Sequence, residues 1–199
     1  DEPQIIHALE GIQVTGSSFA LYDANFTIKE RVRFDLQFRT VYKEGLILLL
    51  YNVRTKDCLT VELFNGQICT RVVNSHYVVS LQSNVKTGKI TDGCWHCLNI
   101  LIDRGQISMK LDLQKFSKIE PRLCNLHLSG CMFIAGFPDH VQPNHTSVRS
   151  SCFWQGGIRA LRINGLEVNW LSSTHTSSSS PESQNVQFSF HTNTEKSVN

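Results

Sequence analysis

The sequence has no long apolar run. The longest one covers only residues 45–51, whereas a helix that spans a membrane needs about 20 apolar residues. The chain also does not open with the charged and apolar leader of a secreted precursor. We therefore expect a soluble piece of a larger protein, with no direct insertion into a membrane.

An excess of charge of one sign is also lacking. The 19 Lys and Arg residues against 17 Asp and Glu residues leave a net charge of +2. Such a balance gives no global attraction to nucleic acid or to an anionic membrane. We predict no nucleic-acid partner, and any charged partner must be recognised by a local patch.

Motifs of the common catalytic sites are absent as well. The sequence contains no Gly-x-Ser-x-Gly, no His-Glu-x-x-His and no phosphate-binding glycine loop. The segment Cys94-Trp95-His96-Cys97 has the cysteine spacing of a redox motif. Such motifs open a helix, whereas this segment opens a predicted strand whose alternation sends the two cysteines to opposite faces. We predict that the protein is not an enzyme.

The sequence does contain a series of short strand patterns. Apolar and polar residues alternate from Lys29 to Arg39, residues 45–51 are typical of a strand covered on both faces, and Asn65-Gly66 predicts a tight hairpin turn. Further strands are predicted at 77–81, 97–102, 106–113, 132–134 and 158–163. No helical stripe appears. Many short strands separated by turns about every ten residues predict an all-β sandwich or barrel.

Cysteines and glycosylation motifs indicate the compartment. Seven cysteines are unusual for a cytosolic chain of 199 residues. Asn25-Phe26-Thr27 and Asn144-His145-Thr146 are both permitted N-glycosylation sites. Together these features favour a secreted protein, or the extracellular part of a cell-surface protein, with disulfide bonds and glycans. The odd number of cysteines leaves at least one thiol without a partner in the chain, and the pairing stays open.

Four segments, in the right order and spacing, resemble the laminin G-like family, whose members are also called LNS domains. Residues 44–51 resemble its D-G-L-L-L-Y strand, and residues 57–68 resemble its D-x-L-x-L-x-L-x-x-G-x-L hairpin. Residues 92–96 match D-G-x-W-H, and residues 154–165 are close to F-x-G-C-I-x-x-L-x-I-N-G. The resemblance covers about residues 5–171. Gly157 stands where the family usually has a cysteine, and Cys152 is a candidate substitute.

This resemblance implies a two-sheet antiparallel jelly-roll sandwich of the laminin G-like, concanavalin-like kind, with Trp95 packed in its core. It also implies one laminin G-like domain over residues 1–171. Residues 172–199 are rich in Ser and Thr, which predicts a flexible linker. Residues 186–191 alternate and could add one edge strand.

The family's calcium site lies on one rim of the sandwich. By resemblance, its ligands here are Asp57, Asn74, Asn125 and His127. Calcium prefers about six to eight oxygen ligands, and this set contains a single carboxylate. A weak calcium site and a metal-free rim, in which Asp57 only caps a turn, therefore both stay open.

A basic stripe gives a second candidate site. Its residues lie on the polar side of one predicted strand: Lys29, Arg31, Arg33 and Arg39. Alternate residues of a strand stand about 7 Å apart, a spacing that suits the sulfates of a polyanionic glycan. The alternative is a solvated sheet face with Glu30 and Asp35 nearby.

The function we predict is that of a non-enzymatic extracellular module for cell adhesion or matrix assembly. Its rim loops, with or without calcium, would recognise a protein receptor or a sulfated or acidic glycan, with neighbouring modules in a larger chain. Two alternatives stay open: a carrier that holds a steroid-like or lipid-like ligand between the sheets, and a structural spacer.

Overall fold

The computed structural model describes residues 11–17, 19–86, 88–143 and 147–168. Apart from one short 3-10 turn, η1 (Pro121–Leu123), the regular elements of this part are strands. In chain order they are β1 (Gly11–Thr15), β2 (Ala20–Lys29), β3 (Arg31–Arg39), β4 (Gly45–Tyr51), β5 (Cys58–Phe64), β6 (Gln67–Val73), β7 (Val78–Gln82), β8 (His96–Asp103), β9 (Gln106–Leu111), β10 (Gln114–Ile119), β11 (His127–Ile134), β12 (Gln155–Ile163) and β13 (Leu166–Glu167). No helix in the described ranges is long and apolar enough to cross a membrane.

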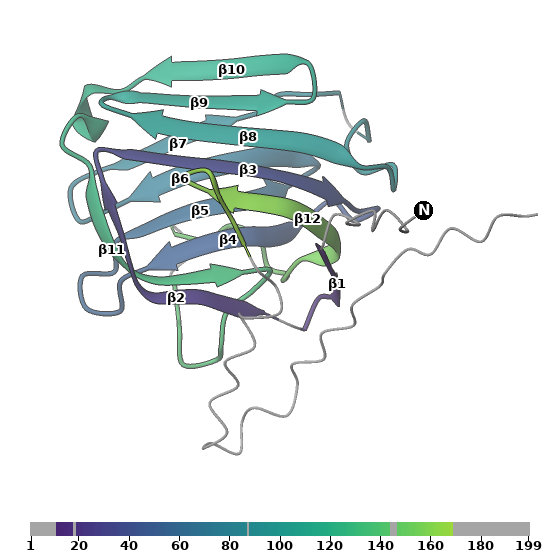
Figure 1. The fold of residues 1–199 in the computed structure, drawn as a ribbon, viewed down its shortest axis with the longest axis horizontal. Helices are drawn as coiled ribbons and strands as arrows, with labels where there is room; N and C mark the ends of the chain where they lie inside the picture. Colours follow the sequence, from purple (N-terminus) through teal and green to yellow (C-terminus); the bar gives the residue numbers. More distant parts are fainter. Residues whose placement is uncertain (1–10, 18, 87, 144–146, 169–199) are drawn as a thin grey trace, which may run out of the picture.

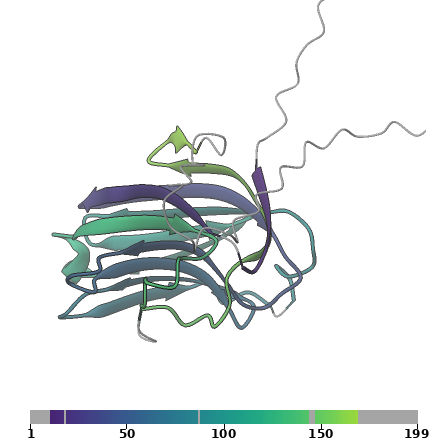
Figure 2. The ribbon, with the colours of Figure 1, turned by 90° about the horizontal axis from the view of Figure 1, so that it is seen from below.

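The strands form two antiparallel layers that lie face to face (Figures 1 and 2). One layer has the order β10-β9-β8-β3-β12-β1, with β13 also paired to β12. The other has the order β2-β11-β4-β5-β6-β7. The layers join at a corner where Lys29 of β2 pairs with Arg31 of β3 across Glu30, whose φ is 60°. The predicted two-sheet antiparallel sandwich is confirmed.

Two-residue turns set the register of the hairpins. Asn65 and Gly66, between β5 and β6, have φ values of 50° and 72°. Arg104 and Gly105, between β8 and β9, repeat this pattern with 39° and 87°. Positive φ at both central residues is what the tightest hairpin turns require. The predicted Asn65-Gly66 hairpin is thereby confirmed.

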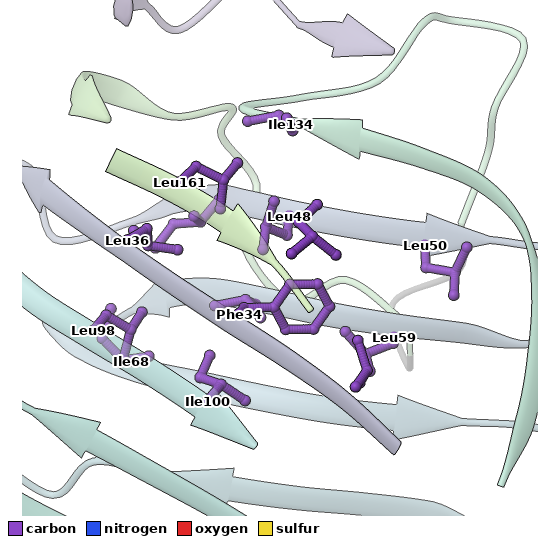
Figure 3. Close-up of a cluster of buried hydrophobic side chains, with 14 of the residues drawn as sticks. Phe34, Leu36, Leu48, Leu50, Leu59, Ile68, Leu98, Ile100, Ile134 and Leu161 are labelled. Atoms are coloured by element: carbon purple, nitrogen blue, oxygen red, sulfur yellow. The ribbon is translucent and has the colours of Figure 1, made fainter. Parts of the chain in front are cut away.

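The interior lies between the two layers. The alternation predicted for β3 is present, because Val32, Phe34, Leu36 and Phe38 are at most 3% exposed. Figure 3 shows Phe34 and Leu36 meeting side chains of the opposite layer and of β8 and β12: Leu48, Leu50, Leu59, Ile68, Leu98, Ile100, Ile134 and Leu161. This packing leaves the outer side of β3 to polar residues.

The strand β4 is covered on both faces, as predicted. Every residue of β4 is buried, although only one of its faces looks into the sandwich. Leu46, Leu49 and Tyr51 instead pack with Val141 and Val148. These two valines belong to the long connection between β11 and β12, which covers the outer face of the layer.

The tryptophan of the core is Trp154, and the expectation that Trp95 fills this role is wrong. Trp154 is fully buried, and its ring lies edge-on to Phe38 with 5.7 Å between the ring centroids. Trp95 precedes β8 and is only half-buried. The position before a strand carried Trp95 onto the outer surface, where its contacts are described below.

The boundaries predicted for the domain, 1–171, and for the linker, 172–199, are not decided by the structure. The sandwich occupies most of residues 11–168, but the linker and its predicted strand at 186–191 lie outside the described residues. These assignments stay predictions.

Replacing Trp154 by Ala should lower the free energy of unfolding by about 3–5 kcal/mol, as expected for the loss of a large buried side chain. Trp95→Ala should cost distinctly less, because that ring is only half-buried. Urea denaturation followed by far-ultraviolet circular dichroism measures both. An equal or larger loss for Trp95→Ala would contradict this assignment of the core.

Candidate functional site

The predicted calcium rim begins at the open end of the β5–β6 hairpin. The pairing of these strands places Asp57 and Asn74 next to each other just beyond it. The Asp57 carboxylate accepts a 2.8 Å hydrogen bond from the Thr55 hydroxyl. The Asn74 side-chain oxygen accepts the backbone N–H groups of His76 and Tyr77 at 2.8 and 2.9 Å. Both side chains thus close turns within their own loops.

Asn125 and His127 lie where the chain enters β11. His127 is the first residue of that strand, and both side chains are exposed. The Asn52 side chain donates to the Ser129 carbonyl, and its backbone N–H donates to the Asp57 carbonyl, each at 2.9 Å. These bonds tie β11 to the loop of Asp57. Among the described residues, however, no hydrogen bond joins Asn125 or His127 to the other two predicted ligands.

A guanidinium group also lies at this rim. The Arg122 guanidinium is 5.5 Å from the centroid of the Tyr77 ring and donates two 2.7 Å hydrogen bonds to the Glu120 carboxylate. These bonds hold the pKa of Glu120 down to about 2. Burial raises the pKa of Tyr77, the charge of Asp57 raises it further, and Arg122 lowers it. Asp57 and Arg122 therefore act on the same ring.

These donors do not fit a calcium ion. Calcium prefers about six to eight oxygen ligands, several of them charged. The set supplies one carboxylate, an amide oxygen that already accepts two N–H groups, and an imidazole nitrogen. Within the described ranges, no group of three or more His, Cys, Asp or Glu side chains is placed to hold a metal ion. We use no metal in the function proposed below.

The predicted glycan-binding residues lie along one strand and the corner beside it. Lys29 ends β2, and the other three point outward from β3. The Arg33 Nε atom is 2.8 Å from an oxygen of Asp35, whereas Arg31 is 3.9 Å from Asp103. The carboxylate of Asp35 thus neutralises the middle of the stripe. In the described part of the chain, neither Lys29 nor Arg39 forms an ion pair.

Arg39 instead shares an aromatic ring with an arginine from another strand. The guanidinium carbons of Arg39 and Arg159 lie 5.0 and 4.0 Å from the centroid of the Trp95 ring. The Arg159 Nε–H donates to the Gln37 side chain at 2.8 Å, and Arg39 makes a longer bond of 3.4 Å to Gln13. We call Arg39, Trp95 and Arg159 the basic surface.

Gly157 makes room for this arrangement. It pairs with Arg39 of β3 and Gln13 of β1. A Cβ atom at Gly157 would lie 2.7 Å from the Cη2 atom of Trp95 and 3.2 Å from the Cγ atom of Arg39. Real Cβ contacts are essentially never as short as the first of these. Any side chain at this position would therefore displace the Trp95 ring.

A buried histidine holds the segment that carries Trp95. The His96 Nδ1 atom is 2.9 Å from Asp112, and its Nε2 atom is 3.0 Å from Asp92. Carboxylates only accept hydrogen bonds, so both ring nitrogens donate when His96 is an imidazolium. The same carboxylates accept the backbone N–H groups of Cys94 and Cys97, each at 2.8 Å. Three consecutive parts of the chain are thereby clamped together.

The carboxylates decide the charge of His96. Burial alone lowers the pKa of this imidazole, but the hydrogen bonds and charges of Asp112 and Asp92 outweigh burial, and the pKa lies above its ordinary value. The bonds from Cys94 and His96 lower the pKa of Asp92. A charged pair of bonds therefore stabilises the fold at neutral pH.

A cavity of about 390 Å³ opens beside the basic surface. It lies where β1 and β3 end and β12 begins, and Arg39 and Tyr42 contribute to its wall. This position is at the edge of the sandwich and outside the interior shown in Figure 3. It therefore gives no support to a carrier that holds its ligand between the sheets.

The predicted modification sites have different outcomes. Asn25 is exposed on β2, so its glycosylation stays a prediction, whereas Asn144 lies outside the described residues. All seven cysteines are described, and none forms a disulfide bond. Cys152 does not replace the expected bridge at Gly157, and burial raises the pKa of Cys58 to about 11, which makes that thiol unreactive.

Sequence comparisons identify relatives of the chain. Residues 38–166 match the model of the Laminin G domain. The chain is 24% identical to laminin subunit alpha-1 of Mus musculus over 160 residues, and equally so to that of Homo sapiens. The match covers 78% of this chain but only 5% of each laminin subunit.

Solved structures share the fold. The mouse laminin alpha1 chain, domains LG4-5, has a TM-score of 0.69 and 22% identity over 79% of this chain and 41% of that one. The LG1-3 region of the laminin alpha2 chain has a TM-score of 0.61 and 17% identity over 81% and 28%. The full extracellular region of zebrafish Gpr126/Adgrg6 gives 0.56 and 14% over 77% and 21%. These similarities show the sandwich and its jelly-roll topology.

Calcium titration by calorimetry should give no saturable heat with the unaltered protein or with Asp57→Ala, because the rim oxygens already accept hydrogen bonds within the protein. The melting temperature should be the same in calcium and in EDTA. Saturable heat that disappears in Asp57→Ala would contradict this result and restore the predicted metal site.

His96→Gln should lower the free energy of unfolding by about 2 kcal/mol at pH 6, since it removes charge-assisted hydrogen bonds. The folded-state pKa is raised, so this contribution is complete below about pH 6.5, the ordinary His value, and is lost as the pH rises through the raised pKa. The difference between the two proteins should therefore narrow at pH 9. Urea denaturation at both pH values checks this. His76→Gln, at an exposed position, is the control, and a constant difference for His96→Gln would contradict the clamp.

Proposed function

The chain belongs to the laminin G domain family, and from this premise we propose that it binds a sulfated or acidic glycan through the basic surface, without calcium. Laminin G domains are generally non-enzymatic binding modules of extracellular proteins. Within that role, the partner is inferred from the chemistry of Arg39, Trp95 and Arg159.

The observation that carries the proposal is a pair of guanidinium groups over one indole with no carboxylate beside them. Arg39 and Arg159 both contact the Trp95 ring, and in the described part of the chain neither forms an ion pair. Two like charges that share a ring repel each other until an anion lies between them. A guanidinium binds a carboxylate or a sulfate through two parallel hydrogen bonds.

The surrounding contacts prepare the site for such an anion. The Gln37 side chain fixes the Nε–H group of Arg159, which leaves the terminal nitrogens free to donate. The His96 clamp and the bare backbone of Gly157 fix the indole. Because the cationic groups are held in place before binding, less conformational entropy is lost when the partner arrives.

The stripe predicted from the sequence extends this site. Arg31 and Lys29 continue the row of cations toward the corner between the layers, whereas the charge of Arg33 is compensated by Asp35. A long polyanion lying along β3 would therefore gain most at Arg39 and Arg159 and less at Arg33.

Heparin chromatography tests this proposal. The double variant Arg39→Ala with Arg159→Ala should elute at a clearly lower salt concentration than the unaltered protein. Arg54→Ala with Lys56→Ala removes the same charge from an exposed loop at the other end of β4 and should change heparin elution much less.

A sulfonate cation exchanger, run in parallel, separates recognition from net charge. Both double variants should shift equally on that matrix, because they lose the same charge. Equal shifts on heparin as well would contradict a glycan site at the basic surface. Elution that is the same with calcium and with EDTA is expected for every protein.

A further inference from the structure

We propose that the cavity beside Arg39 binds one carboxylate-bearing sugar residue of the glycan held on the basic surface. This inference rests on the proposed function and adds a second contact that selects among acidic glycans. It begins from the position of the cavity, which shares Arg39 with the basic surface.

The cavity exists because two consecutive glycines form part of this edge of the sheet. Gly156 lines the cavity, and Gly157 separates Arg39 from Gln13 across three paired strands. A Cβ atom at Gly156 would lie 2.1 Å from the Arg39 carbonyl oxygen, and the φ of this glycine is 137°. Side chains are therefore excluded from the place where the ends of β1 and β3 approach β12.

The groups around the cavity match a polyhydroxylated ligand with one negative charge. Arg39 is its cationic residue, and no Asp or Glu of the described residues lines it. The side chains of Gln13, Gln155 and Thr15 supply neutral donors and acceptors. One guanidinium among neutral amides and hydroxyls balances one carboxylate, whose planar pair of oxygens suits the guanidinium fork.

Tyr42 adds an aromatic surface for the ring of a sugar. Its side chain is 51% exposed, and its backbone N–H donates to the Thr40 hydroxyl at 3.1 Å. That hydroxyl donates in turn to the Gln155 carbonyl at 2.6 Å. The turn that presents Tyr42 is thus fastened to the start of β12, and the phenol stays at the cavity mouth.

The size of the cavity also suits a small unit. Its volume of about 390 Å³ lies at the lower end of the range of roughly 300–1,000 Å³ that is typical of small-ligand pockets. A cavity of this size holds one residue of a glycan, while the rest of the chain continues over Arg159. The two contacts together would give higher affinity than either one alone.

Nuclear magnetic resonance titration of the isotope-labelled 199-residue chain tests the inference with three probes. Sodium glucuronate should shift the backbone amides of Gln155, Gly156 and Tyr42 in a saturable way. Glucose, which carries a hydroxymethyl group in place of the carboxylate, should not. Glucose 6-sulfate carries the negative charge in a tetrahedral group and should bind more weakly; equal or tighter binding would overturn the assignment to a carboxylate.

Two variants locate the binding. Tyr42→Ala should weaken glucuronate binding about five-fold, equivalent to ~1 kcal/mol. Val53→Ala should leave it unchanged, because that exposed side chain lies beyond the other end of β4. Glucuronate shifts that do not centre on the cavity, or that persist unchanged in Tyr42→Ala, would overturn the inference.

The two proposals can fail separately. Specific heparin retention without saturable glucuronate shifts would leave the basic surface as the binding site and reject the cavity. Saturable shifts at Gly156 without specific heparin retention would support the cavity and reject the proposed function.

Discussion

The outer surface of this sandwich depends on the missing side chain at Gly157. With no Cβ atom there, the Trp95 ring lies over the backbone of β12, at a distance that any other residue would forbid. The ring then offers its π-system to Arg39 and Arg159, which come from two neighbouring strands. The residue that removes the expected cysteine thereby also creates the binding surface, so that a covalent link is exchanged for a recognition site.

Interior and surface are coupled through β8. His96 is buried and its ring lies 5.6 Å from that of Phe38, whereas Trp95, one residue earlier, lies on the outside. The carboxylates of Asp92 and Asp112 bind the imidazole and the backbone on either side of it. Because a buried charge is costly when a partner is lost, the clamp restricts the loop before β8. Core packing against Phe38 therefore helps to fix the position of the exposed indole.

Local patterns predicted the fold well, and long-range pairing limited the prediction of the site. The alternation of β3 and the Asn65-Gly66 turn each depend on adjacent residues, and the structure confirms both. Strands β2 and β10 were not predicted, because they carry many polar residues and β10 is mostly exposed. Arg159 was missed as a partner of Trp95, since only the register of β12 against β3 brings it there. Its exposed place in an alternating segment was the only local signal.

The two ends of the sandwich differ in how they use their polar groups. At the rim of Asp57, the carboxylate, the amide of Asn74 and the guanidinium of Arg122 all have partners inside the protein. At the edge of Arg39, the guanidinium has only a long bond to Gln13, and Tyr42 is half-exposed. A polar group that is already satisfied gains little from a ligand, because it must first give up a bond it has. The incompletely paired cations and the cavity beside them therefore favour binding at this edge, away from the rim where sequence resemblance predicted a metal.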